Sequence, residues 1–220
     1  MIKRKIDSWL EHFFTNNKKA LLITGARQIG KTFSIRRFGR EHFKQFVEIN
    51  FIENPNLIKI FSKATDRQDL LLRLSTITKQ KLIPRDTLIF FDEVQECPDI
   101  ITAIKFLVEE GSYRYVMSGS LLGVEIKDLR SAPVGYMTVK EMFPIDFEEF
   151  ASAIGINREI IDKLEEHFNT VSVVDEFIHT KMMEIFRLYL IVGGMPSVVE
   201  KYLETNNLQE VMTEQQSIVR

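Results

Sequence analysis

The eight residues GARQIGKT, at positions 25–32, are the most informative segment of this sequence because they fit the pattern G-x-x-x-x-G-K-[ST]. They follow the apolar run LLITG (21–25), which predicts a strand buried on both faces, and a helix is expected to begin at about Lys31. The glycines let the backbone curl so that its N–H groups and the helix N-terminus point at one anion. Because the pattern lies between a strand and a helix, we interpret it as a phosphate-binding loop rather than only a tight turn.

Two side chains of this loop have expected chemical roles. Lys31 can reach the β- and γ-phosphates of a nucleotide, and the Thr32 hydroxyl can ligate Mg²⁺. The loop therefore predicts ATP and Mg²⁺ as cofactors and Lys31 as a catalytic residue. Arg27 and Gln28 lie at variable positions, where either could contact phosphate, contact a neighbouring subunit or remain solvated. The predicted nucleotide contacts of the loop are Gly25, Ala26, Arg27, Gln28, Ile29, Gly30, Lys31, Thr32 and Phe33.

Two carboxylates follow a second apolar run, TLIFF (87–91). Acidic residues at the carboxyl end of a buried strand emerge at the edge where α/β sheets bind ligands. Asp92 is expected to hold Mg²⁺, together with Thr32 and through a water, because Mg²⁺ gives up its water reluctantly. Glu93 is expected to orient and deprotonate an attacking water, as the second catalytic residue. An apolar run ending in Asp-Glu is a weak signal alone, but its place downstream of the phosphate loop indicates a shared site.

A third polar group ends the predicted strand in YVMSGS (115–120). Ser118 is interpreted as the end of that strand and Ser120 lies two residues further on. Either hydroxyl could bond the γ-phosphate or the attacking water, so both are counted as nucleotide contacts. A Ser-Gly-Ser turn without any nucleotide contact stays the alternative.

Hydrophobic patterns predict alternating strands and helices as far as residue 143, and therefore a parallel sheet with right-handed crossovers. Beyond Pro144 only helical patterns occur. We predict two parts, 1–143 with the phosphate loop and an N-terminal helix, and 144–220 as a helical lid or linker. The expected strands are 21–25, 46–51, 87–91, 113–117 and 136–142, and the expected helices of the first part are 6–16, from about 31, 56–80 with a break near 65–66, and 98–110.

Composition narrows the class of protein further. The 220 residues have a formal net charge of −2 and one cysteine, Cys97, so a nucleic-acid partner has no support from net charge and no intrachain disulfide can form. We expect packing for Cys97, a cytoplasmic location, and no membrane partner, since no apolar run approaches the ~20 residues that a spanning helix needs. The four histidines are scattered without zinc spacing, and no G-x-S-x-G occurs.

Five motifs in this order resemble the prokaryotic AAA-type P-loop ATPases with a C-terminal domain of unknown function. They are GARQIGKT, FFDEVQECP, MSGSLLG, FPIDFEEF and YLIVGGMPSVV, and together they span nearly the whole chain. The resemblance implies a sheet of about five strands in the order 5-1-4-3-2. It also implies phosphate and Mg²⁺ contacts for Lys31 and Thr32, Mg²⁺ for Asp92, the catalytic base for Glu93, and a sensor role for Ser118 or Ser120.

The chain departs from this family pattern in two ways. Many relatives have Gly-Arg where this chain has Gly135-Tyr136, so a charge-stabilising arginine is missing there. Arg130 lies nearby without an assigned role, and another subunit could supply an arginine. Relatives are also roughly twice as long, so we interpret residues 144–220 as leading into a truncated C-terminal domain.

Two functions follow from these residues. The first is an AAA-type ATPase that hydrolyses MgATP to ADP and phosphate to drive a conformational change. The second is a nucleotide-gated module with negligible hydrolysis that recruits a protein or DNA partner, because a missing arginine can cost about 10³–10⁵-fold in rate. A GTPase is less favoured, since no N-K-x-D occurs. A homo-oligomer or a protein partner is possible under either function.

Overall fold

The computed structural model describes the chain except for residues 1, 63–66, 79–80, 121–134 and 220. It contains two compact units. The α/β unit is Ile6–Met142, and the helical unit combines residues 1–5 with Phe143–Arg220. The first five residues therefore belong with the C-terminal part of the chain, whereas the sequence pattern placed them with the core. Whether either unit is an independent domain stays a prediction.

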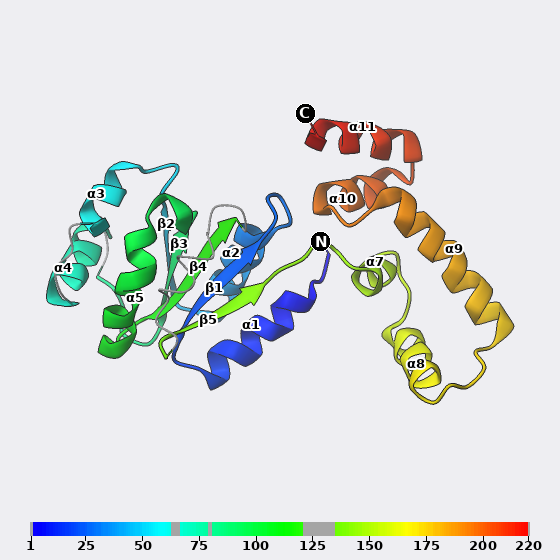
Figure 1. The fold of residues 1–220 in the computed structure, drawn as a ribbon, viewed down its shortest axis with the longest axis horizontal. Helices are drawn as coiled ribbons and strands as arrows, with labels where there is room; N and C mark the ends of the chain where they lie inside the picture. The colour runs from blue at the N-terminus through cyan, green and yellow to red at the C-terminus, as the bar shows by residue number, and fades with distance from the viewer. Residues whose placement is uncertain (1, 63–66, 79–80, 121–134, 220) are drawn as a thin grey trace. The chain divides into compact units, whose positions relative to one another are not determined.

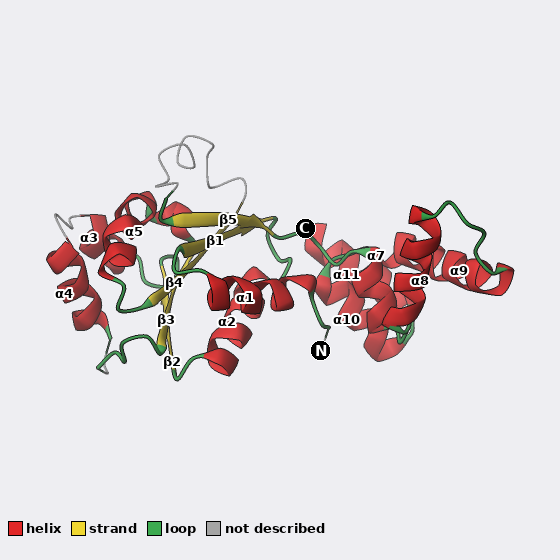
Figure 2. Cartoon of the chain, turned by 90° about the horizontal axis from the view of Figure 1, so that it is seen from below, coloured by secondary structure: helices red, strands yellow, loops and turns green. Residues whose placement is uncertain are grey.

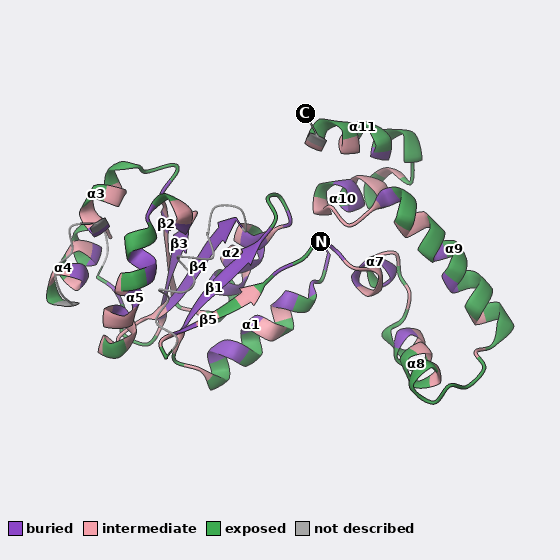
Figure 3. Cartoon of the chain, in the orientation of Figure 1, coloured by how far each residue is buried: buried purple, intermediate pink, exposed green. Residues whose placement is uncertain are grey.

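Five parallel strands form the sheet of the α/β unit, in the order β2-β3-β4-β1-β5 (Figure 1). This is the implied order 5-1-4-3-2 counted from the other edge, so the fold-class prediction is confirmed. Every residue of β1 and β3 is buried, as their mainly apolar sequences predict (Figure 3). The strands are β1 Ala20–Gly25, β2 Gln45–Asn50, β3 Thr87–Asp92, β4 Arg114–Ser120 and β5 Met137–Glu141.

Helices cover the sheet on both faces (Figure 2). Leu22 and Phe91 belong to an apolar cluster that also contains residues of α3, α4 and α5. On β2, Phe46 stacks with Phe90 at 6.1 Å between ring centroids and lies against Gly39 of α2. The helical elements of this part are α1 Lys5–Asn16, α2 Lys31–His42, α3 Asn56–Ser62, α4 Arg67–Ile77, the 3₁₀ turn η1 Val94–Glu96 and α5 Pro98–Glu110.

The described residues after Phe143 form helices and no strand, as the sequence predicts for this segment. The first helix begins at a capping box, in which the Asp146 side chain accepts from the Glu149 backbone and the Glu149 side chain accepts from the Asp146 backbone. Phe150 packs against Tyr189 at 5.4 Å between ring centroids. The helices are α7 Phe147–Ala153, α8 Arg158–Asn169, α9 Glu176–Val192, α10 Pro196–Thr205 and α11 Leu208–Val219.

A buried ion pair attaches the N-terminal residues to the helical unit. Arg4 Nε lies 3.1 Å from Glu149 Oε2, and both side chains are under 10% exposed, at 9% and 7%. Arg4 Nη2 also donates to the Phe143 carbonyl at 2.7 Å, and the Lys5 backbone N–H donates to Glu149 Oε1 at 2.6 Å. These bonds satisfy a charge that burial alone would disfavour. They explain why a short basic segment is part of this unit.

In the part of the chain that the structure describes, no single helix has the length and apolar composition of a membrane span. Helices α9 and α10 meet that test only as a pair, and they are bent by 120° at the break between them.

Candidate functional site

The loop between β1 and α2 has the backbone that its glycines predict. Gly25 has φ 148° and Gly30 has φ 93°, and Gly30 is the residue that precedes the first turn of α2. A Cβ on Gly25 would lie 2.3 Å from the Met142 carbonyl oxygen, so only glycine fits there. Gln28 is also left-handed, with φ 64°. The loop therefore curls at the start of a helix, which is the arrangement that binds phosphate.

Lys31 lies at the base of this loop and is only 8% exposed. Its Nζ donates to the Gly25 carbonyl at 3.0 Å and to the Ala26 carbonyl at 2.6 Å. Burial lowers the pKa of Lys31, although the nearby Glu93 and Asp92 carboxylates act in the opposite direction. A buried cation beside an anion-binding loop is suited to contact phosphate oxygens.

Asp92 is the centre of a polar cluster formed by three other elements. Ser118 of β4 donates to Oδ1, and Asn50 of β2 donates to Oδ2 at 3.1 Å. The Thr32 hydroxyl of α2 lies 3.3 Å from both oxygens. Burial raises the pKa of the Asp92 carboxyl, and the Ser118 hydrogen bond opposes this shift. The sequence prediction paired Asp92 with Thr32, and the structure brings them into contact.

The Thr32 and Asp92 oxygens fit the requirements of Mg²⁺. This ion takes hard oxygen ligands and keeps several waters, so one hydroxyl and one carboxylate suffice when phosphate oxygens complete the shell. Among the described residues, no group of three or more histidines, cysteines or acids could enclose a metal ion.

Glu93 has an unusual backbone for a residue other than glycine. Its φ of 57° and ψ of 51° are left-handed, and it precedes the 3₁₀ turn η1. Such conformations cost about 1–3 kcal/mol and concentrate at functional sites. The Gln95 amide nitrogen donates to Glu93 Oε2 at 2.5 Å. Glu93 is half-buried, whereas the neighbouring Asp92 is buried.

The two predicted sensor residues lie differently from the sequence interpretation. Strand β4 continues through Ser120, so Ser118 is inside the strand rather than at its end. Both hydroxyls belong to buried residues, and Ser120 lies opposite Gly25 in the register of β1 and β4. A strand rather than a turn forms here because β4 is flanked on one side by β1 and on the other by β3. The Ser118 hydroxyl contacts Asp92. A nucleotide contact by Ser118 or Ser120 stays a prediction.

The other residues predicted to contact the nucleotide differ in how far they are exposed to solvent. Ala26, Arg27 and Gln28 are exposed, Ile29 is buried, and Phe33 is 52% exposed. Backbone groups of this segment remain candidates for nucleotide contact whatever their side chains do.

Sequence reasoning missed two residues of the site, Asn50 and Gln95. Asn50 is paired in register with Asp92 and closes the strand QFVEIN, so a polar residue ending a neighbouring strand was the available signal. Gln95 follows Glu93 by two positions, and only the fold of η1 brings its amide onto that carboxylate.

Tyr136, which stands where many relatives have an arginine, lies at the end of the sheet opposite the phosphate loop. The Ala20 backbone N–H donates to the Tyr136 carbonyl at 2.9 Å, so Tyr136 lies beside the first residue of β1. The phosphate loop follows the last residue of β1, roughly 17 Å away at about 3.3 Å per residue. Tyr136 is therefore not adjacent to the phosphate loop of its own chain. Arg130 lies outside the described residues.

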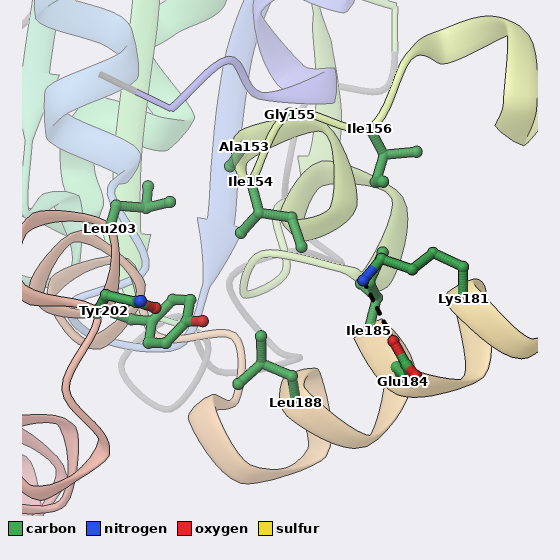
Figure 4. A pocket seen from close by; sticks show the side chains of 11 residues that line it. Ala153, Ile154, Gly155, Ile156, Lys181, Glu184, Ile185, Leu188, Tyr202 and Leu203 are labelled. Atoms are coloured by element: carbon green, nitrogen blue, oxygen red, sulfur yellow. Dashed lines mark hydrogen bonds and ion pairs between the residues drawn. The ribbon is translucent and has the colours of Figure 1, made fainter.

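A surface cavity of about 630 Å³ occurs in the helical unit, between the end of α7 and helices α9 and α10 (Figure 4). Ile154, Ile185 and Leu188 give it an apolar lining, and Lys181 pairs with Glu184 at 3.2 Å. None of the predicted site residues lines it.

One comparison with known proteins identifies a family that includes the loop. A family model described as "AAA domain" matches residues 17–151, more than half of the chain. Two solved structures show distant similarity at 13% identity, a RuvB variant of Thermotoga maritima with a TM-score of 0.43 and PCH-2 of C. elegans with 0.48. The alignments cover 98% and 96% of this chain, and 82% and 67% of those chains. These scores are too low to support a functional argument. No curated protein matches the sequence significantly.

Proposed function

The chain belongs to the AAA-domain family, and we propose that it binds MgATP and hydrolyses it to ADP and phosphate to drive a conformational change. One observation supports this proposal above the others. The Thr32 hydroxyl and the Asp92 carboxylate come from separate elements and lie 3.3 Å apart beside the Lys31 loop. An ordinary strand-loop-helix turn has no need of this arrangement.

Each group of the site would have a distinct task. The loop N–H groups and Lys31 would bind the phosphate oxygens, while Thr32 and Asp92 would hold Mg²⁺. When bound, Mg²⁺ would neutralise charge on the β- and γ-phosphates. Glu93 would accept a proton from the attacking water and orient it.

Glu93 is a better candidate for the base than Asp92. Three side chains already donate to the Asp92 carboxylate, from Ser118, Asn50 and Thr32. In the described part of the chain, Gln95 is the one residue hydrogen-bonded to the Glu93 carboxylate, and it contacts only Oε2. One oxygen of Glu93 is therefore left to accept a proton, and the two neighbouring acids have separate roles.

The test is steady-state ATP turnover with Mg²⁺ by the full chain, together with nucleotide binding. Glu93→Gln should reduce kcat by at least about 100-fold and keep ATP binding, since it removes the base but not the phosphate contacts. Lys31→Ala should lose both. A kcat of Glu93→Gln equal to that of the wild type would refute the assignment of the base. Failure of the wild type to bind ATP would refute the phosphate-loop interpretation.

A nucleotide-gated module with negligible hydrolysis is the second candidate. Two arginines of α2 are engaged elsewhere, Arg36 with Glu48 and Arg37 with Asp7. The site therefore has Lys31 as its one buried cation among the described residues. Tight binding of ATP with less than one turnover per hour would favour this function. A protein partner or a second copy of the chain would then supply the missing charge.

The cellular setting belongs to the same proposal. Cys97 packs in the core of the α/β unit, and burial raises the pKa of its thiol to about 11. The thiol is thus suited to packing rather than to reaction. The single unreactive cysteine supports a cytoplasmic location, and membership of the AAA-domain family supports a protein partner or a homo-oligomer. The net charge of −2 gives no support to a nucleic-acid partner.

A further inference from the structure

We propose that Gln95 is a positioning residue that holds the Glu93 carboxylate in the orientation required for catalysis. The inference rests on the proposed function, because it takes Glu93 as the base. Its starting point is the hydrogen bond from Gln95 Nε2 to Glu93 Oε2, which joins two side chains at 2.5 Å.

The two neighbouring acids differ in how they are held. Asp92 receives hydrogen bonds from three side chains on three elements. Glu93 receives one, from Gln95, within the described residues. Loss of a single donor therefore leaves Asp92 held by its other hydrogen bonds but frees Glu93, a long side chain with several rotatable bonds.

The backbone fixes where Gln95 lies. Glu96 N–H donates to the Glu93 carbonyl and Cys97 N–H donates to the Val94 carbonyl, both at 3.0 Å, which closes the turn η1. Val94 is 0% exposed and Cys97 is 1% exposed, so two residues of this segment are anchored in the core on either side of Gln95. The amide is consequently presented to Glu93 from a rigid support, as a positioning group must be.

A glutamine is chemically suited to this task. Its neutral amide can orient a carboxylate without cancelling the negative charge that makes it a base, as a lysine or arginine would. It contacts one carboxylate oxygen and leaves the other to the attacking water.

Packing alone does not explain the residue. The Gln95 Oε1 atom is buried and has no hydrogen-bond partner among the residues that the structure describes. An unpaired buried carbonyl is destabilising because it has lost its hydrogen bonds to water, and a leucine or methionine of similar size would avoid that loss. The amide nitrogen must therefore provide something that an apolar side chain would not, and its bond to Glu93 is that contribution.

The test compares Gln95→Leu with a matched control, Glu96→Gln, at the exposed neighbouring position of the same turn. Gln95→Leu should lower kcat about 10- to 100-fold, the range expected when a reacting group is slightly misplaced, with KM and the ATP dissociation constant within about twofold of wild type. Glu96→Gln should leave all three unchanged. A kcat of Gln95→Leu within twofold of wild type would overturn the proposal.

A double-mutant cycle separates positioning from a general loss of structure. If Gln95 acts through Glu93, the double variant Gln95→Leu/Glu93→Gln should be no slower than Glu93→Gln alone. Multiplied losses in the double variant would instead show an independent structural effect and refute the inference. Unchanged turnover in Glu93→Gln would refute Glu93 as the base and with it this role of Gln95, whereas a wild type that neither binds nor hydrolyses ATP would refute the proposed function. Loss in Glu93→Gln without loss in Gln95→Leu would refute only the role of Gln95.

Discussion

In the α/β unit the buried charges Lys31 and Asp92 lie at the carboxyl edge of the sheet and do not form an ion pair with each other. In the helical unit the buried charges Arg4 and Glu149 pair at 3.1 Å, and the Glu149 oxygens also accept two backbone N–H groups. The first set is bonded to neutral groups of its own loop and strands, and is suited to receive a charged ligand. The second set is complete within the unit. Under the proposed function, similar burial would therefore have a binding role in one unit and a structural role in the other.

Glu149→Ala should have the largest effect on stability, about 3–5 kcal/mol, because it removes the buried carboxylate that pairs with the buried Arg4 charge. It also removes half of the capping box that starts α7. Urea unfolding followed by circular dichroism would measure the loss. A change below 1 kcal/mol would mean that Arg4 finds another partner or water, and that the pair is not structural.

One glycine in each unit tests the comparison between the α/β unit and the helical unit, because both glycines lie equally close to a backbone carbonyl. A Cβ on Gly25 would meet the Met142 carbonyl at 2.3 Å, and a Cβ on Gly194 would meet the Ile145 carbonyl at 2.3 Å. Either substitution by alanine should therefore destabilise its unit by about 1–3 kcal/mol. Only Gly25→Ala should also weaken ATP binding, by at least tenfold, since only Gly25 shapes the phosphate loop. Titration with a fluorescent ATP analogue would decide this, and equal weakening by Gly194→Ala would contradict it.

Asp92→Asn should stabilise the metal-free protein, in contrast to Glu149→Ala. Burial raises the native pKa of Asp92, so the native state binds this proton more tightly than the unfolded chain does. The contribution of Asp92 to the free energy of unfolding therefore falls as pH rises from about 3.9, the unfolded value, through the native pKa, and remains lowered at neutral pH.

The uncharged amide of the Asp92→Asn variant would remove this loss of stability. The free energy of unfolding should rise by about 0.5–2 kcal/mol at pH 7, and the gain should disappear below about pH 4. Thermal unfolding in a chelator at several pH values would measure the difference. A variant less stable than wild type at pH 7 would show that the hydrogen bonds of Asp92 outweigh its burial.

The smallest effect is expected at the exposed pair Lys181–Glu184, where each side chain is 58% exposed. Lys181→Gln should change stability by less than about 0.5 kcal/mol, because solvent and salt screen such a pair. It serves as the exposed counterpart of the Arg4–Glu149 pair. A loss above 1 kcal/mol would show that this pair supports the cavity wall it lines.

Local patterns were sufficient to predict most of the α/β unit. The runs LLITG and TLIFF predicted β1 and β3 because a strand buried on both faces is rich in apolar residues along its whole length. Pro98 and Gly111 marked the ends of α5, where the fixed φ of proline and the left-handed glycine suit a helix start and stop. Ser118 was misplaced at a strand end because Ser-Gly-Ser has the composition of a turn, whereas pairing with β1 keeps it extended.

The candidate site was predictable only where one segment contains it. The sequence by itself determined the phosphate loop and the acidic strand end, since the chemistry of glycine, lysine and carboxylates is local to those segments. Tertiary structure alone decided that Asn50 and Ser118 hold Asp92, because strand order sets which side chains meet. It likewise decided that Arg4 is buried against Glu149, 145 residues away. Contacts between distant segments depend on packing, and no spacing within a single segment encodes them.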